Sequence, residues 1–147
     1  MPPYAERTYR GKINAAGLFS FRVVVKETDI WVSTERNLEK ETRDLVFDCR
    51  HQIESHIKTN PEFATSLQPL SSDPFAPGIV QKMIDATSRV NVGPMASVAG
   101  AVAQYVGEGL LAFSDQVIVE NGGDIFMKTN RPATVSIFAG PSPCLLY

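Results

Sequence analysis

The sequence contains few cysteines, little excess charge and no long apolar run, and each shortage excludes a class of protein. Its 147 residues include two cysteines, Cys49 and Cys144, which lie far apart and form no CxxC pair. This excludes a disulfide framework and a zinc site, while a single disulfide between the two stays open. Fourteen Lys and Arg against sixteen Asp and Glu give a net charge of −2 without a basic stripe, which argues against a nucleic-acid partner.

Apolar segments of the length that a membrane requires are also missing. No uninterrupted run approaches the ~18 residues of a membrane-spanning helix, and the first residues lack the apolar centre of a signal peptide. We therefore expect a cytoplasmic protein with no membrane partner. The length, with 44% hydrophobic and 20% charged residues, fits a single globular domain.

Strand patterns occur at both ends of the chain and helical patterns lie between them. From Leu38 to Ile57 the apolar residues recur every three or four positions, which predicts an amphipathic helix that ends at Asn60 because Pro61 follows. Strands, then helices, then strands predict an α+β fold, with helices packed on one face of an antiparallel sheet. We expect strands at 8–13, 18–25, 29–34, 116–120, 124–128 and 133–139, further helices at 78–90 and 94–111, an ordered loop at 62–77, and a turn at 14–17.

Residues 91–103 are the first candidate binding segment. Gly93 permits an unusual backbone, and Pro94 suits the first turn of a helix. Ala, Ser and Gly dominate the residues that follow, so a flat ring or another element can approach closely, and the helix N-terminus suits a phosphate or carboxylate. The pattern equally fits a helix packed tightly on the sheet without a ligand, and it lacks the spacing of a phosphate loop or dinucleotide fingerprint.

A glycine-rich turn near the C-terminal end is the second candidate. Strand patterns on both sides of Asn121, Gly122 and Gly123 predict a hairpin, because these residues tolerate positive φ. The glycines expose main-chain groups, and the carboxylates of Glu120 and Asp124 bracket them. Those carboxylates fit ribose hydroxyls, a ring N–H or a divalent cation. Alternatively, Asp124 only satisfies the amides of the turn.

Other polar residues give weaker signals. His51 and His56 are five residues apart and do not share a helix face, so they are expected to be solvated. Cys49 falls on the apolar stripe, which favours a core position over a nucleophile. Ser97 has no His at motif spacing, which argues against a serine hydrolase. Residues 27–29 form a tight turn by default, although their carboxylates could reach a site at the sheet edge.

Five stretches together resemble an uncharacterised family of prokaryotic proteins related to ApbE, the FAD:protein FMN transferase once linked to thiamine biosynthesis. The stretches are residues 27–30, 73–77, 92–100, 119–125 and 139–143. The resemblance covers nearly the whole chain. Its most specific part is the Gly-Pro-Met sequence that begins the helix.

The resemblance implies a T-fold-like sheet backed by helices and a ligand site for FAD or FMN. ApbE transferases also use a divalent cation such as Mg²⁺ to support attack on the FAD pyrophosphate by a Ser or Thr hydroxyl of a target protein. Carried over to this sequence, the flavin-binding candidates are Gly93, Pro94, Met95, Ala96, Ser97, Gly100, Asn121, Gly122, Gly123 and Asp124.

Two departures accompany the resemblance. The transferase pattern has a lysine in its glycine-rich helix, where this chain has Ala99 beside Gly100. Relatives continue past Pro143, and in the transferases that later part supplies the Asp and Thr ligands of the cation. We therefore expect a chain without its C-terminal part and without those ligands. An open sheet edge then favours a homo-oligomer.

Three functions stay open on these grounds. The leading hypothesis is an ApbE-like flavin or nucleotide binder, including a degenerate transferase, with no catalysis expected from these 147 residues. The second is a non-flavin accessory protein in sulfide assimilation into homocysteine, for which Cys49 would be of interest. The third is a structural assembly module. The leading hypothesis requires the glycine turn and the start of the third helix to meet, with bare main-chain groups facing a shared hollow.

Overall fold

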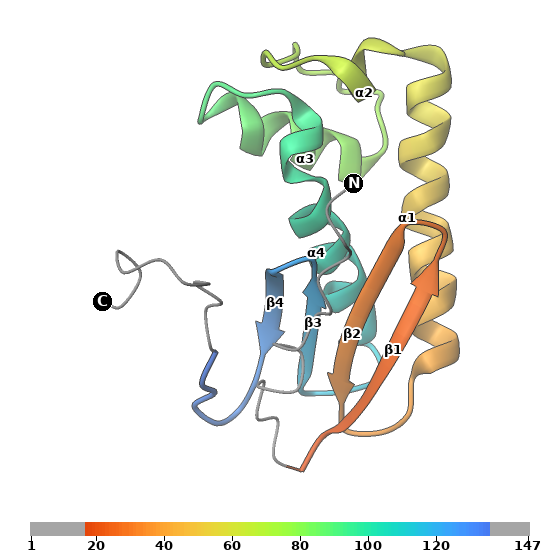
Figure 1. Cartoon of the computed structure of the whole chain (residues 1–147), viewed down its shortest axis with the longest axis vertical. Coiled ribbons are helices and arrows are strands. Elements are labelled where there is room, and N and C mark those ends of the chain that lie inside the picture. Colours follow the sequence, from red (N-terminus) through yellow and green to blue (C-terminus); the bar gives the residue numbers. More distant parts are fainter. Residues whose placement is uncertain (1–16, 136–147) are drawn as a thin grey trace, which may run out of the picture.

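Four antiparallel strands form one sheet in the computed structural model, which describes residues 17–135 (Figure 1). The strands lie in the order β1-β2-β3-β4, so two hairpins from distant parts of the chain pair through their inner strands. Val32 of β2 lies opposite Val119 of β3 in that central pairing. The strands are β1 (Phe19–Val25), β2 (Thr28–Thr34), β3 (Val117–Asn121) and β4 (Asp124–Lys128).

Both hairpins close through two-residue turns in which positive φ values occur. Lys26 in the first turn has a φ of 51°, and Gly122 and Gly123 in the second have φ values of 62° and 103°. Positive φ at both central residues matches the twist of the flanking strands. The Asn-Gly-Gly signal therefore predicted the second hairpin correctly. The tight turn expected at residues 27–29 lies instead at Lys26 and Glu27, because Thr28 and Asp29 already pair with β1.

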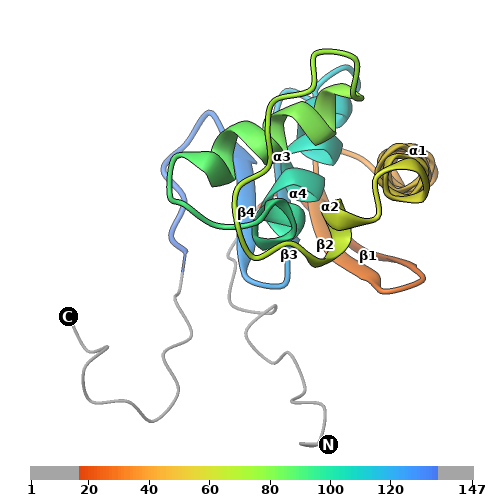
Figure 2. The same cartoon turned by 90° about the horizontal axis from the view of Figure 1, so that it is seen from above.

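The helices lie on the same side of the sheet. Figure 2, which views the molecule from above, shows α1, α3 and α4 over one sheet face. Helix α1 packs against β1 and α4, and α4 packs against β3 and β4. The helical elements are α1 (Glu39–Thr59), α2 (Glu62–Thr65), α3 (Gly78–Ser88), the 3₁₀ turn η2 (Pro94–Ser97) and α4 (Val98–Leu110).

The core fills the space between the sheet and these helices. Strand β1 alternates in burial, with Phe21, Val23 and Val25 buried and the residues between them exposed, which is the period-two pattern of a half-covered strand. These side chains share one buried cluster with Val46 of α1 and Val106 of α4. The predicted α+β class, with helices packed on an antiparallel sheet, is confirmed.

Several predicted boundaries need correction. The loop expected at 62–77 contains the short helix α2, which begins directly after Pro61. The third helix is not α-helical from Pro94, because its first turn is the 3₁₀ segment η2. Residues 133–135 are not part of a strand. The strand expected at 8–13, most of the turn at 14–17 and residues 136–139 lie outside the described residues.

Two further features of the described residues bear on the expectations above. No helix in residues 17–135 is long and apolar enough to cross a membrane. Within the same residues, β1 and β4 form the two edges of the sheet. The homo-oligomer expected from an open edge stays a prediction.

Candidate functional site

The glycine turn lies directly against the start of α4. The side-chain amide of Asn121 donates a hydrogen bond of 3.1 Å to the carbonyl oxygen of Ala99. A Cβ atom placed on Gly100 would lie 3.6 Å from Oδ2 of Asp124, which is ordinary van der Waals contact. The two segments chosen from the sequence therefore meet in space, which is one part of what the leading hypothesis requires.

Glu120 holds the turn itself. Its side chain is buried, and its Oε1 accepts a hydrogen bond of 2.9 Å from the backbone N–H of Gly123. A carboxylate that accepts from a turn amide fixes the turn, since the charged acceptor strengthens the bond. The N–H of Gly123 is thus engaged within the protein, and of the two hairpin carboxylates Asp124 is the one that lines the hollow.

The start of the third helix is packed more tightly than the sequence suggested. A Cβ atom on Gly93 would lie 1.8 Å from the carbonyl oxygen of Ser66, so glycine is required here by the approach of another backbone. Pro94 beside it is buried. Two amides of this turn are already bonded, from Ala96 to the Gly93 carbonyl and from Val98 to the Met95 carbonyl. The 3₁₀ turn therefore uses N–H groups that were expected to face a ligand.

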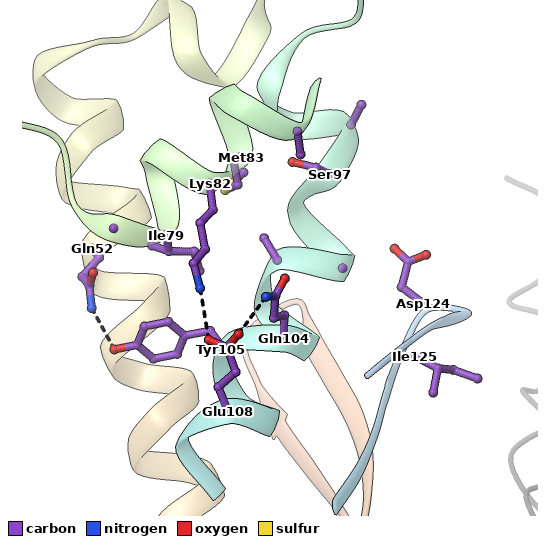
Figure 3. Close-up of a pocket in the computed structure, with 15 residues that line it drawn as sticks. Gln52, Ile79, Lys82, Met83, Ser97, Gln104, Tyr105, Glu108, Asp124 and Ile125 are labelled. Carbon is purple, nitrogen blue, oxygen red and sulfur yellow. Dashed lines mark hydrogen bonds and ion pairs between the residues drawn. The ribbon is translucent and has the colours of Figure 1, made fainter. Parts of the chain in front are cut away.

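A hollow of about 640 Å³ opens beside the next turn of this helix (Figure 3). Its walls come from α3, from η2 and α4, and from the start of β4, with one residue from α1. Its volume lies within the range of about 300–1,000 Å³ that is typical of small-molecule sites. The lining residues are Gln52, Gly78, Ile79, Lys82, Met83, Ala86, Ala96, Ser97, Gly100, Ala101, Gln104, Tyr105, Glu108, Asp124 and Ile125.

One ion pair spans the hollow's helical wall. Lys82 Nζ of α3 lies 3.1 Å from Glu108 Oε2 of α4, and Gln104 donates a 2.7 Å hydrogen bond to the other carboxylate oxygen of Glu108. Figure 3 shows these three side chains converging, with Asp124 on the hairpin across from them. The hydrogen bond from Gln104, helped by Lys82, lowers the pKa of Glu108. Glu108 is therefore a carboxylate at neutral pH.

A second polar group stands where α1 meets α4. The hydroxyl of Tyr105 donates a hydrogen bond to Asp48, and the side-chain amide of Gln52 contacts both residues, at 3.0 Å in each case. Burial, followed by the bond to Asp48, raises the pKa of Tyr105. Tyr105 thus stays a neutral hydrogen-bonding group held in one orientation at the hollow.

A smaller hollow of about 410 Å³ lies against a different part of the start of α4. Two of the candidates, Met95 and Asn121, line this second hollow rather than the first. Arg50 lines it too, and its guanidinium donates to Thr28, Glu27 and Glu54 at 2.7–2.8 Å. Residues 27–28 therefore reach Arg50 of α1 rather than the first hollow.

The candidates from the sequence thus divide between several places. Ala96, Ser97, Gly100 and Asp124 line the first hollow, and Met95 and Asn121 the second. Gly93 and Pro94 pack into the protein, and Gly122 and Gly123 form the turn. Sequence reasoning missed the side chains from the polar faces of three helices. These are Gln52, Lys82, Gln104, Tyr105 and Glu108.

The described residues do not fit a divalent-cation site. Between residues 17 and 135 no group of three or more His, Cys, Asp or Glu side chains is placed to hold a metal ion. At the first hollow, Glu108 is paired with Lys82, which leaves Asp124 as a single hard ligand, whereas Mg²⁺ sites usually combine one or two carboxylates with ligand phosphates. We therefore assign no step to a metal.

Cys49 and His56 pack against other side chains of the protein. Cys49 is fully buried in the core, where burial raises the pKa of its thiol to about 12. A thiol that stays protonated is a poor nucleophile and metal ligand, so its expected core position is confirmed. The ring of His56 packs edge-on against Phe63, with centroids 5.0 Å apart, and His51 is exposed.

These features define an α+β domain with a hollow between its helices and its last hairpin. The chain belongs to the family described as AbpE bacteria, which matches residues 10–145. It is 37% identical over 125 residues to a UPF0280 protein of Methanocaldococcus jannaschii, covering 84% of this chain and 50% of the relative.

Two more relatives carry the same name, which states no function. The chain is 37% identical over 128 residues to a UPF0280 protein of Methanococcus vannielii, covering 86% of this chain and 52% of the relative. It is 42% identical over 104 residues to one from Methanothrix thermoacetophila, covering 69% and 44%. The chain thus spans about half the length of the curated relatives it matches.

Proposed function

We propose that this protein binds a flavin or a related nucleotide in the hollow between α3, α4 and β4. The observation that carries the proposal is the meeting of the small-residue face of α4 with Asp124 of the glycine hairpin at one preformed hollow. Such a site combines an apolar, closely approachable wall with a few placed polar groups, which is the usual composition of a cofactor pocket.

The walls suit a flat ring with one polar edge. Ala96, Gly100 and Ala101 present almost no side chain on the α4 side, while Ile79 and Met83 supply an apolar surface from α3. A ring that lies against α4 loses contact with water on its faces. Burial of apolar surface stabilises binding by roughly 25 cal/mol per Å², less the entropy that the ligand loses.

Asp124 and Ser97 provide the polar contacts of this proposal. A carboxylate only accepts hydrogen bonds, so Asp124 selects a ring N–H or a ribityl or ribose hydroxyl. The hydroxyl of Ser97 donates to the Pro94 carbonyl at 2.9 Å, which leaves its oxygen as an acceptor toward the hollow. Both groups favour donors on the ligand.

Binding is the core of the proposal, and FMN transfer is a further step. The resemblance to ApbE points to transfer onto a Ser or Thr of a target protein, with the present chain as a degenerate relative of those enzymes. Because the chain spans about half the length of its relatives, that activity is to be sought in a longer protein.

A titration of FMN and FAD, followed by flavin fluorescence, tests the proposal. The decisive variant is Gly100→Leu, which places a large side chain in the hollow at a position where the backbone accepts one. We expect the unchanged chain to bind flavin and Gly100→Leu to bind at least about tenfold more weakly, since the added side chain occupies the ring's place.

Ala64→Leu is the matched control, because Ala64 is exposed on α2 and does not line the hollow. It should bind flavin like the unchanged chain, and thermal unfolding should show that both variants are folded. No binding by the unchanged chain at high micromolar flavin, or equal binding by Gly100→Leu, would contradict the proposal.

A further inference from the structure

We propose that Lys82 recognises a phosphate group on the flavin by exchanging its ion pair with Glu108 for an ion pair with that phosphate. This inference rests on the proposed function. Lys82 would then make the hollow prefer a phosphorylated ligand over the same ligand without phosphate.

The charges around the hollow single out Lys82. Among the described residues that line it, Lys82 is the one cation, while Glu108 and Asp124 carry negative charge. A phosphate placed beside Asp124 would be repelled, whereas one placed beside Lys82 would be attracted. The charge pattern thus orients a phosphorylated ligand, with its hydrogen-bond donors toward Asp124 and its phosphate toward α3.

Lys82 and Asp124 stand on different walls of the hollow. Figure 3 shows Lys82 reaching from α3 toward Glu108 and Gln104 on α4, with Asp124 on the separate hairpin wall. Lysine is a flexible point charge on a four-carbon stem. Its ammonium group can therefore turn from Glu108 toward a ligand in the same hollow without movement of the helices.

The Lys82–Glu108 pair is suited to such an exchange. Its side chains are 60% and 46% exposed, and an ion pair in that environment contributes little to stability. Gln104 remains bonded to Glu108 at 2.7 Å after Lys82 turns away, so the carboxylate keeps a partner. The protein therefore exchanges one charge-assisted contact for another, and a phosphate offers Lys82 more negative charge than a carboxylate does.

Riboflavin and FMN separate the phosphate from the rest of the ligand, because they differ by one phosphate group. Both are titrated at low salt against the 147-residue chain and the variants Lys82→Met, Lys82→Arg and Glu108→Gln. The matched control is Lys40→Met, which removes a lysine from an exposed i,i+4 pair with Asp44 on α1.

The unchanged chain should bind FMN more tightly than riboflavin. Lys82→Met should weaken FMN binding by about tenfold, which is the effect of one hydrogen bond to a charged group, and leave riboflavin within about twofold. Lys82→Arg should restore much of the FMN preference. Glu108→Gln should strengthen FMN binding by about threefold, because it removes a competing carboxylate. Lys40→Met should change neither ligand.

Two kinds of result would overturn the inference. One removes only the role of Lys82, and the other removes the flavin site as well. If riboflavin and FMN bind the unchanged chain equally, or if Lys82→Met weakens both alike, Lys82 has no phosphate-recognising role while the flavin site stands. If neither flavin binds the unchanged chain, the proposed function fails and the role of Lys82 fails with it. Circular dichroism of each variant shows whether a loss of binding reflects a loss of fold.

Discussion

The helical segment 94–110 is packed tightly at some glycine positions and open at another. Added Cβ atoms would lie 1.8 Å from Ser66 at Gly93, 1.9 Å from the Phe126 ring at Gly107 and 2.6 Å from Leu45 at Gly109. At Gly100 the nearest atom is 3.6 Å away, on Asp124. An added Cβ atom would therefore collide with a backbone at Gly93 and with an aromatic ring at Gly107, whereas at Gly109 only the flexible end of Leu45 would have to move. Gly100 borders the hollow with room for a side chain.

Glycine therefore has two different roles within this helical segment. Where a neighbour occupies the space of a Cβ atom, a larger residue must displace that neighbour at a cost in stability. Where the space is empty, glycine weakens the helix by up to about 1 kcal/mol relative to alanine. A glycine of the second kind is the more informative about function. The following predictions test whether substitutions at the two kinds of glycine differ in their effects on stability and binding.

The buried thiol of Cys49 on α1 should show the largest effect. Because the pKa of Cys49 is raised from 9.0 to about 12, its thiolate fraction at pH 8 is about a thousandfold lower than that of an ordinary cysteine. In a Cys144→Ser background, a thiol reagent should label Cys49 at least about a hundredfold more slowly in the native than in the urea-unfolded protein. Rapid native labelling would contradict the core position.

The same shift sets a direction for stability against pH. Below pH 9 both folded and unfolded forms keep the proton, so Cys49 gives no pH dependence there. Between about pH 9 and 12 the unfolded form loses the proton first, and Cys49 makes stability fall as pH rises. Cys49→Ala should flatten this part of the curve.

Gly93→Ala should cause the largest loss of stability among the glycine substitutions. Its Cβ atom meets a backbone carbonyl, which cannot turn aside as a side chain can. We expect a loss of about 3 kcal/mol in the free energy of unfolding, at the upper end for an overpacked site. Urea denaturation measures it. Gly78→Ala, with no atom within 4 Å of the added carbon, is the control and should change little.

Gly107→Ala should destabilise less, because the obstacle is the ring of Phe126. We expect a net loss of about 1–2 kcal/mol, since overpacking opposes the better helix propensity of alanine. A double-mutant cycle with Phe126→Ala isolates the contact. In the Phe126→Ala background the glycine substitution should no longer destabilise, and an unchanged loss there would show that the ring is not the obstacle.

Gly100→Ala should have the smallest effect on the free energy of unfolding among these three substitutions, and it should stabilise the protein rather than destabilise it. The helix gains up to about 1 kcal/mol, while one methyl group enters the hollow. Unfolding and FMN titration on the same sample should therefore show raised stability together with weaker binding. Lowered stability would mean that Gly100 is a packing glycine like Gly93 and Gly107, and the contrast between the two kinds of glycine would disappear.

Local patterns in the sequence were sufficient for most of the fold. The aromatic and β-branched residues at 18–25 predicted β1, the apolar stripe that includes Val46 and Cys49 predicted α1, and Asn121-Gly122-Gly123 predicted the last hairpin. Each signal depends on neighbours in the chain. The short helix α2 and the 3₁₀ turn at Pro94 were missed, because a single turn is fixed by contacts such as Gly93 with Ser66.

The site was only partly accessible to sequence reasoning for the same physical reason. Small residues at 96–100 and the carboxylate of Asp124 gave local signals and do line one hollow. Lys82, Gln104 and Glu108 gave none, since polar side chains on amphipathic helices usually face solvent. Their convergence depends on how α3 packs beside α4, which no spacing along the chain encodes.

The most direct test of the site is an NMR titration of the ¹⁵N-labelled chain with FMN, in which backbone amide shifts report where the ligand lies. If FMN occupies the first hollow, the largest shifts should occur around Gly100 and Ala101 of α4 and at Asp124 of the hairpin. Shifts centred on Arg50 and Ile53, which line the smaller hollow, or no saturable shifts at all, would contradict this placement of the ligand.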